Sequence, residues 1–339
     1  MSFGRYLAYR LLGAVVVLFG VSVLIFGIAR VIPGDPARIA LGPAATQEQV
    51  ERLRERLHLD QPLPIQYWRF LSGVARGDLG MSLYTNRPVA LDLRAFFPAT
   101  LELVLYAGLL MVVLGVPLGL VAARYQDMWP DNVARVIALL GVVTPSFVWA
   151  IFLVLIFAYF MDLLPVMGRT GESAPERITG MHTVDNLLAG DINGFYDSFR
   201  HLILPALALS LSGLGQAARL TRANVGEVYH SNFIEMARAY GLPELQVGLK
   251  YALKPGMIPT LTVLGLDFAA MLGNAFLVEI VFNWPGMARY GVQAILHKDL
   301  NAIVGTVLVI STFFLVVNII VDLIVGYINP KIRLKGAEL

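Results

Sequence analysis

One acid, Asp267, interrupts an otherwise apolar run from Gly256 to Val278. A carboxylate near the middle of a membrane-spanning helix costs about 2.5 to 3.5 kcal/mol to insert, so it needs a water-filled path or a neighbouring helix. Two interpretations stay open. Asp267 lines a pathway, where it contacts an amine or relays protons, or it makes a structural hydrogen bond to another helix. Asn274, in the same run, is the second pathway candidate.

The other side chains do not form a catalytic pattern. The chain has no Gly-x-x-x-x-Gly-Lys-Ser/Thr phosphate loop, no His-Glu-x-x-His and no Gly-x-Ser-x-Gly. Without cysteine it has no disulfide and no thiolate metal site, and its five histidines are scattered over loops. The sequence therefore predicts no catalytic residue, no metal ligand and no cofactor bound by this chain. His201, before an apolar run, is interpreted as an interfacial residue.

The composition is that of a membrane protein. Of the 339 residues, 57 % are hydrophobic and only 15 % are charged, with a mean hydropathy of +0.68. A soluble protein carries about 25 % charged residues, so soluble, disordered and fibrous classes are excluded. The net charge of +2 does not favour nucleic-acid binding.

Six apolar runs approach or exceed the roughly 20 residues that cross the hydrocarbon as a helix. We expect an all-α membrane protein, because porin strands would alternate with a period of two. The first run is too long for a signal peptide. The expected segments are an N-terminal anchor at 1–30 and a domain at 99–328 with spans at about 99–123, 136–161, 202–218, 256–278 and 302–322.

Two prolines lie inside these spans. Pro117 and Pro145 are expected to kink the second and third spans, because proline removes an intrahelical hydrogen bond and crowds the preceding turn. A kink of this kind serves either as a gate or as a packing feature.

Basic residues predict the orientation. With a cytoplasmic N-terminus, the inside segments hold 12 Lys and Arg and the short outside loops hold five, which places both termini in the cytoplasm. Residues 329–339 then form a cytoplasmic tail.

Residues 31–98 form a loop too long to lack structure, so we expect a small helical extracytoplasmic cap there. Thr46 and Gln49 match a capping box, and an amphipathic helix is expected after Pro64.

Glu102 and Glu279 lie at span ends and are interpreted as interfacial. Trp284, before the last span, is interpreted as part of an aromatic belt.

The cytoplasmic loop at 230–250 predicts two short helices. Asn232 can cap the first, with Glu235 at its third position, and Gly241 can end it in a left-handed turn. Pro243 can open the second. Small Ala237 and Ala239 would let another surface approach closely, although a solvated helical hairpin has the same pattern.

This loop resembles the EAA coupling loop of ABC-importer permeases, and nearly the whole chain resembles the first permease subunit of the dipeptide and oligopeptide family. Met236 replaces the usual first alanine of the loop, and Leu253-Lys254-Pro255 departs from the usual Leu-Pro. The other matching pieces, in order, are Pro33-Gly34-Asp35-Pro36, Gly77-Asp78-Leu79-Gly80-Met81-Ser82, Ala99-Thr100-Leu101-Glu102-Leu103, Pro165-Val166-Met167-Gly168-Arg169, Ile203-Leu204-Pro205-Ala206, Trp284-Pro285-Gly286-Met287-Ala288-Arg289 and Asn329-Pro330-Lys331-Ile332-Arg333.

The resemblance implies a type I ABC-importer permease in a bacterial inner membrane. It implies as partners a homologous second permease subunit, two ATPase subunits that bind the ATP and Mg²⁺, and an extracytoplasmic substrate-binding protein. It also implies ATPase coupling through Glu235, Ala237, Ala239, Gly241 and Leu245. The substrate implied is a di- or oligopeptide, with a nickel chelate, glutathione or an oligosaccharide as the alternative within the family. From other classes, a secondary transporter that uses Asp267 and, with less support, a membrane-embedded hydrolase stay open.

Overall fold

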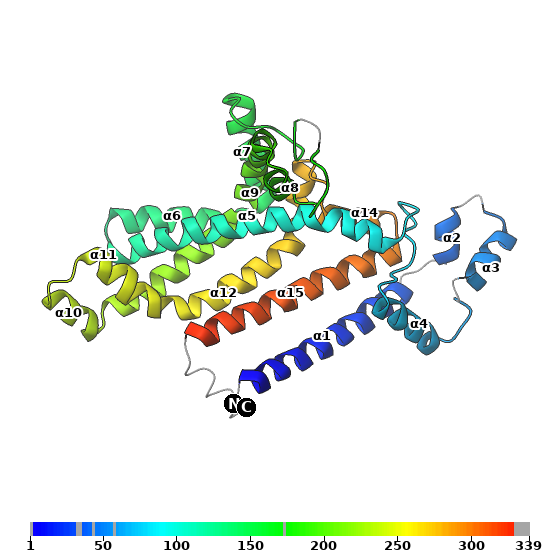
Figure 1. The fold of residues 1–339 in the computed structure, drawn as a ribbon, viewed down its shortest axis with the longest axis horizontal. Helices are drawn as coiled ribbons and strands as arrows, with labels where there is room; N and C mark the ends of the chain where they lie inside the picture. The colour runs from blue at the N-terminus through cyan, green and yellow to red at the C-terminus, as the bar shows by residue number, and fades with distance from the viewer. Residues whose placement is uncertain (1–2, 32–35, 43–44, 57–58, 172–173, 329–339) are drawn as a thin grey trace.

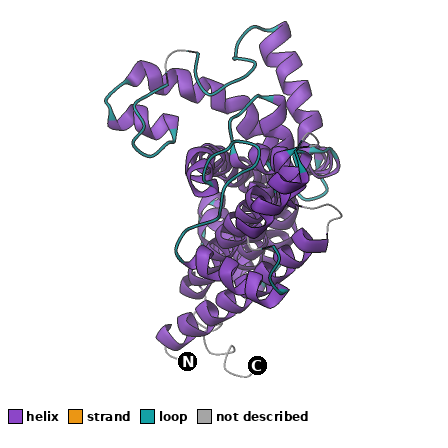
Figure 2. Ribbon diagram, turned by 90° about the vertical axis from the view of Figure 1, so that its right-hand side faces the viewer, coloured by secondary structure: helices purple, strands orange, loops and turns teal. Residues whose placement is uncertain are grey.

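The structure, a computed structural model, describes residues 3–31, 36–42, 45–56, 59–171 and 174–328. Across these ranges the chain is helical, and the only strand-like feature there is an isolated antiparallel bridge between Met81 and Pro88 (Figures 1 and 2). The predicted all-α fold is confirmed.

Five stretches are long and apolar enough to cross a membrane. They are α1 (Phe3–Val31), α5 (Val89–Arg124), α9 (Ile192–Tyr229), the stretch that ends in α12 (Leu253–Asn274), and α15 (Leu300–Ile328). A sixth crossing exists only as a bent pair, in which α6 (Trp129–Val143) meets α7 (Ser146–Leu153) and the π-helical η1 (Val154–Phe160) at 109°. The chain thus has the six predicted crossings if the bent pair is one of them.

The bend in the third crossing lies at Pro145. Thr144 leaves α6 in an extended conformation, and Pro145 precedes the first residue of α7 with φ −58° and ψ 145°. Because the residue before proline avoids the helical region, the helix ends there. The sequence predicted a kink, and the structure has a break. Pro117 lies inside α5, which continues through it, so a kink at Pro117 stays a prediction.

The remaining helices are short. Before α9 they are α2 (Pro36–Leu41), α3 (Gln47–Arg56), α4 (Leu63–Ala75) and α8 (His182–Leu188). The others are α10 (Asn232–Ala239), α11 (Glu244–Gln246), the π-helical η2 (Val247–Ala252), α13 (Phe276–Val281) and α14 (Met287–Leu296).

The capping box before α3 is present as predicted. The amide of Thr46 donates to Oε1 of Gln49 at 2.9 Å, and the amide of Gln49 donates to Oγ1 of Thr46 at 3.3 Å. The helix expected after Pro64 is α4. Most of the Pro33 to Pro36 turn motif lies outside the described residues.

Two spanning helices extend well beyond their apolar runs. The helix expected from residue 99 begins at Val89, and the one expected at 202–218 covers Ile192–Tyr229. The extensions carry polar groups that find partners within the protein. Asp92, fully buried in the first turn of α5, accepts a hydrogen bond from the hydroxyl of Tyr290 at 3.3 Å. A charge therefore ends an apolar run without ending the helix.

Helix α9 is the centre of the bundle and packs against α5, α6 and α12. Glycines permit close approach at these contacts. A Cβ on Gly119 of α5 would lie 2.5 Å from the carbonyl oxygen of Ala218, and one on Gly141 of α6 would lie 2.5 Å from that of Leu211. Small residues at helix interfaces let backbones approach in this way in membranes, where dispersion contacts hold helices together.

We predict that Gly141→Ala destabilises the protein by about 1 to 3 kcal/mol, because the added methyl group meets backbone that cannot move aside. Gly13→Ala, on α1 where a Cβ would meet nothing within 4 Å, should be neutral or stabilise by up to about 1 kcal/mol. Thermal unfolding of both purified variants in detergent tests this. Equal melting temperatures would show that the α6 to α9 contact tolerates expansion.

Candidate functional site

The predicted loop at 230–250 is a compact helical hairpin. Helix α10 starts after Ser231, one residue earlier than the predicted cap Asn232, and Gly241 follows it with φ +76°. That left-handed conformation favours glycine. Pro243 precedes α11, as predicted. The two turns fold the loop back toward the bundle.

Buried apolar side chains join this hairpin to the ends of the long helices. Ile234 and Val247 are fully buried, and they pack in one cluster with Ala123 at the end of α5 and with Val225 and Tyr229 at the end of α9. Because protein interiors are close-packed, a force on the hairpin is transmitted to both helices.

The opposite face of the hairpin carries large exposed apolar side chains. Phe233 and Met236 on α10 and Tyr240, the residue that caps its C-terminal end, follow one another at helical spacing and are exposed by 45 %, 56 % and 80 %. Leu245 is exposed by 67 %. An ion pair between Arg238 and Glu244, at 2.8 Å, links the two short helices. The apolar face of the hairpin consists of Phe233, Met236, Tyr240 and Leu245.

Four of the five predicted coupling residues are accessible. Glu235, Ala239, Gly241 and Leu245 are exposed, whereas Ala237 is 7 % exposed and packs in the cluster beneath the hairpin. Ala237 therefore allows close packing within the loop. Phe233 and Tyr240 were not predicted from the sequence, although their spacing opposite Ile234 was the signal for them.

Asp267 and Asn274 line one cavity of about 420 Å³ between the broken third crossing, α9 and α12. Oδ2 of Asp267 is buried and has no hydrogen-bond partner in the described part of the chain. The polar side chains that share the cavity are Thr144, Ser146, Ser212 and Gln216. The bend at Pro145 brings Thr144 and Ser146 to this wall, so the proline break and the mid-span acid meet at one place.

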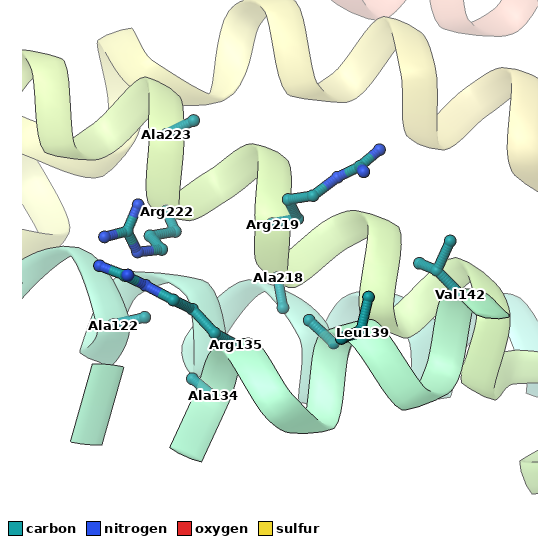
Figure 3. Close-up of a pocket in the computed structure, with 10 residues that line it drawn as sticks. Ala122, Ala134, Arg135, Leu139, Val142, Ala218, Arg219, Arg222 and Ala223 are labelled. Atoms are coloured by element: carbon teal, nitrogen blue, oxygen red, sulfur yellow. The ribbon is translucent and has the colours of Figure 1, made fainter. Parts of the chain in front are cut away.

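A second cavity, of about 500 Å³, is lined by α5, α6 and α9 and shares Val142 with the first cavity (Figure 3). In Figure 3, Arg135 and Arg222 point toward each other, whereas Arg219 points away from them. Asp131, which is fully buried, accepts hydrogen bonds from Arg135 at 2.6 Å and Arg222 at 2.8 Å. The contact between Arg222 and Asp131 joins α9 to α6 and was not anticipated from the sequence, where the two residues lie 91 positions apart.

Glu102 is buried and paired. Its Oε2 forms an ion pair with Arg169, and its Oε1 accepts hydrogen bonds from the amide of Thr183 at 2.8 Å and from the hydroxyl of Thr183 at 2.6 Å. Arg169 also donates to the carbonyl of Gly180 at 3.0 Å. The interfacial interpretation of Glu102 was wrong, because its side chain is 2 % exposed.

Glu279 forms the second buried set. Thr100 donates to one carboxylate oxygen, and the amide of Arg289 donates to the other at 2.6 Å. A Cβ on Gly286 would lie 2.0 Å from this carboxylate, so only glycine fits there. Glu279 is fully buried, and its interfacial interpretation was also wrong.

The aromatic-belt interpretation of Trp284 was wrong for the same reason. Trp284 is 1 % exposed and its indole N–H donates to the carbonyl of Ala99 at 2.9 Å. His201 is 8 % exposed, with Nδ1 2.9 Å from the carbonyl oxygen of Asp197, so it is buried rather than interfacial. Sequence position near a span end did not distinguish protein contact from lipid contact.

Two titratable side chains near the Glu102–Arg169 ion pair, His182 and Asp185, each keep one charge state near neutral pH. Burial lowers the pKa of His182 to about 4, with a further contribution from the positive charge of Arg169. Burial alone would raise the pKa of Asp185, but hydrogen bonds from Thr179 and Gly180 outweigh it and lower the pKa below its usual value. Near neutral pH, His182 is therefore neutral and Asp185 is charged.

Comparison with known proteins gives matches over the whole chain. A family model described as "Binding-protein-dependent transport system inner membrane component" matches residues 115–334, and its N-terminal companion matches residues 3–104. The probable D,D-dipeptide transport system permease protein DdpB of Escherichia coli K12 is 41 % identical, over 100 % of both chains. The dipeptide transport system permease protein DppB of Alkalihalophilus pseudofirmus is 38 % identical, over 97 % of this chain and 99 % of the relative. The glutathione transport system permease protein GsiC of Escherichia coli K12 is 36 % identical, over 98 % and 99 %.

We predict that Glu102→Gln and Arg169→Met each destabilise the protein by about 3 to 5 kcal/mol, because each leaves one partner of a buried ion pair uncompensated. The double variant should lose less unfolding free energy than the two single variants lose together, since the pair is coupled. Thermal unfolding in detergent measures this, with Arg177→Met, at an exposed arginine, as the control. Additive losses would contradict a coupled pair.

Proposed function

This chain belongs to the family of inner membrane components of binding-protein-dependent transport systems, and from that premise we propose that it forms half of the membrane pathway of an ATP-driven importer of di- or oligopeptides. The observation that carries the proposal is the 41 % identity to a dipeptide permease over the full length of both chains. A relative named for glutathione is also similar. Glutathione is itself a peptide, so a peptide pathway accommodates both.

The proposed partners are a second, homologous permease subunit, two ATPase subunits and an extracytoplasmic binding protein. The chain has no phosphate loop, so ATP and Mg²⁺ are assigned to the ATPase subunits. The distribution of basic residues supports an orientation with both termini and the 230–250 loop in the cytoplasm and the 31–98 cap outside.

The hairpin at 230–250 is proposed to dock on an ATPase subunit. Its apolar face exposes large side chains on a loop that would otherwise have no reason to present them to water. Its buried face packs against the ends of α5 and α9. When ATP closes the ATPase pair, movement of the hairpin would therefore move these helices and change which side of the membrane the pathway faces.

The cavity at Asp267 and Asn274 is proposed to belong to the pathway. α9 supports this assignment, because it is one continuous helix from the hairpin to Ser212 and Gln216 in the cavity wall. A displacement of α9 by the hairpin would change the cavity directly. The break at Pro145 lies in the opposite wall and is proposed as a hinge of the same movement.

A secondary transporter that uses Asp267 as a proton relay predicts uptake without an ATPase. Transporters of that class usually have several buried ionisable groups along a relay. Among the side chains that line the Asp267 cavity, Asp267 is the single acid and there is no histidine. Uptake into vesicles that contain both permease subunits and no ATPase would favour the relay and contradict the proposed function.

We predict that Glu235→Ala and Gly241→Asp each leave membrane insertion intact and lower ATP-dependent peptide uptake by about tenfold, equivalent to about 1.4 kcal/mol of coupling free energy. Gly241→Asp adds strain at a positive φ and a charge beside the apolar face. The measurements are uptake in proteoliposomes of the complete transporter and retention of the ATPase in a pull-down.

Glu55→Ala is the matched control for the glutamate variant, because Glu55 is an exposed acid on α3 in the cap. It should leave uptake and ATPase retention unchanged. Normal ATPase retention with wild-type uptake in the Gly241→Asp transporter would show that the hairpin is not the coupling element.

We predict that Asp267→Leu assembles normally and lowers uptake of peptides with a free amino terminus more than uptake of the same peptides after N-acetylation. The carboxylate would attract an ammonium group and has no such attraction for an amide. Asp267→Asn keeps the shape and should give the same selectivity change. Unchanged uptake across the substrate panel would assign Asp267 a structural role.

A further inference from the structure

Helix α4 of the cap packs against the C-terminal half of the spanning helix α1. The hydroxyls of Tyr67 and Ser22 lie 2.8 Å apart, and the ring of Tyr67 contacts Phe19 and Phe26, with centroids 6.1 and 5.3 Å away. The ring of Phe70 stacks on Phe26 at 5.7 Å. Figure 1 shows α4 beside the C-terminal end of α1, with α2 and α3 farther along the chain's long axis.

These contacts fix the depth of α4. The stretch of α1 that is long and apolar enough to span the membrane is Ala8–Ile28, and its partners for α4 are residues 19 to 26. At 1.5 Å per residue, those positions lie about 3 to 14 Å below the Ile28 end of the span. An amphipathic helix in a bilayer surface lies about 5 to 10 Å into the boundary between headgroups and acyl chains. Helix α4 is therefore held at the level of that boundary rather than above it.

The face of α4 turned away from α1 suits this boundary. Ile65 is exposed by 47 % and Trp68 by 69 %, and both fall on one side of the helix. Arg69 and Arg76 flank them, are exposed, and form no ion pair in the described part of the chain. The helix itself contains no Asp or Glu. An indole beside unpaired guanidinium groups is typical of a protein surface at the lipid headgroups.

We propose that α4 lies in the lipid–water interface of the bilayer, with Ile65 and Trp68 among the upper acyl chains and Arg69 and Arg76 at the lipid phosphates. The apolar window of α1 is itself only 6 % buried in the chain, so α1 also leaves most of its surface free for lipid beside α4. On the orientation proposed above, the leaflet is the outer one. The cap is then anchored to the membrane at α4 and extends outward from it.

Hydrogen bonds to Asp299 fix the other end of the cap. Ser82, after α4, donates to the buried carboxylate of Asp299 at the start of α15, and the amide of Leu83 donates to it at 2.7 Å. The cap is thus fixed to α15 at one end and to lipid beside α1 at the other, which orients α2 and α3 relative to the membrane plane. The proposal requires only that α1 spans the bilayer and does not depend on the peptide substrate or on the coupling loop.

The absence of cysteine from the chain permits a direct test. Trp68→Cys and, on the same face, Ile65→Cys each provide one site for a nitroxide spin label in the complete transporter, assembled with cysteine-free partners in nanodiscs of phosphatidylcholine and phosphatidylglycerol. Electron paramagnetic resonance then compares collisions with oxygen, which concentrates in lipid, and with a water-soluble nickel chelate. Val16→Cys, on the exposed face of α1, is the lipid control, and Glu55→Cys on α3 is the water control.

The proposal predicts an oxygen-to-chelate collision ratio at residues 65 and 68 several-fold above that at residue 55 and below that at residue 16. A ratio equal to that at residue 55 would overturn it, and a fall in chelate collisions on adding the binding protein would then identify this face as a protein docking site. Protection from both reagents would also overturn it, because it would show that another subunit covers the face.

Discussion

The buried carboxylates of Glu102 and Glu279 impose the constraint on which the half of the molecule away from the 230–250 hairpin depends. Where water is scarce, a carboxylate must receive its hydrogen bonds from the protein or it costs several kcal/mol. Glu102 takes them from Arg169 and Thr183, and Glu279 takes them from Thr100 and from the amide of Arg289 in α14. Thr100 and Glu102, close together in α5, thus fix two separate loops. Three of the segments that carried the family resemblance, 99–103, 165–169 and 284–289, meet in this network.

Helix α9 connects this hydrogen-bonded half of the molecule to the 230–250 hairpin. Its 38 residues extend for about 57 Å at 1.5 Å per residue. One end starts beside α8, the middle supplies Ser212 and Gln216 to the Asp267 cavity, and the other end packs on the hairpin. Close glycine contacts with α5 and α6 leave little freedom for independent movement. A displacement at the hairpin is therefore best accommodated as a movement of α9 with its neighbours, against the opposite end of the bundle, which the Glu102 and Glu279 hydrogen bonds hold.

Local signals predicted local structure well and contacts between distant residues poorly. The capping box of α3, the left-handed Gly241 and the break at Pro145 each depend on a few adjacent residues, and each was visible in the sequence. The interfacial interpretation of Glu102 failed because its partner lies 67 residues away. Hydropathy shows that a charge is near a span end, but it does not show whether lipid, water or protein surrounds it. The same limit hid the inward orientation of Ala237.

The contrast with the buried acids gives Asp267, a half-buried one, its significance. Glu102 and Asp131 each meet an arginine, and Glu279 accepts hydrogen bonds on both oxygens. Asp267 has no ion pair or hydrogen bond among the described residues, and its Oδ2 is shielded from solvent. A protein that satisfies the acids around it would retain an unsatisfied one at a cost, unless a group absent from the isolated chain completes it. The cavity beside Asp267 has room for such a group, either from a passing substrate or from the second permease subunit. Asp267 makes no hydrogen bond to another helix within the described part of this chain, so both interpretations of its role stay predictions.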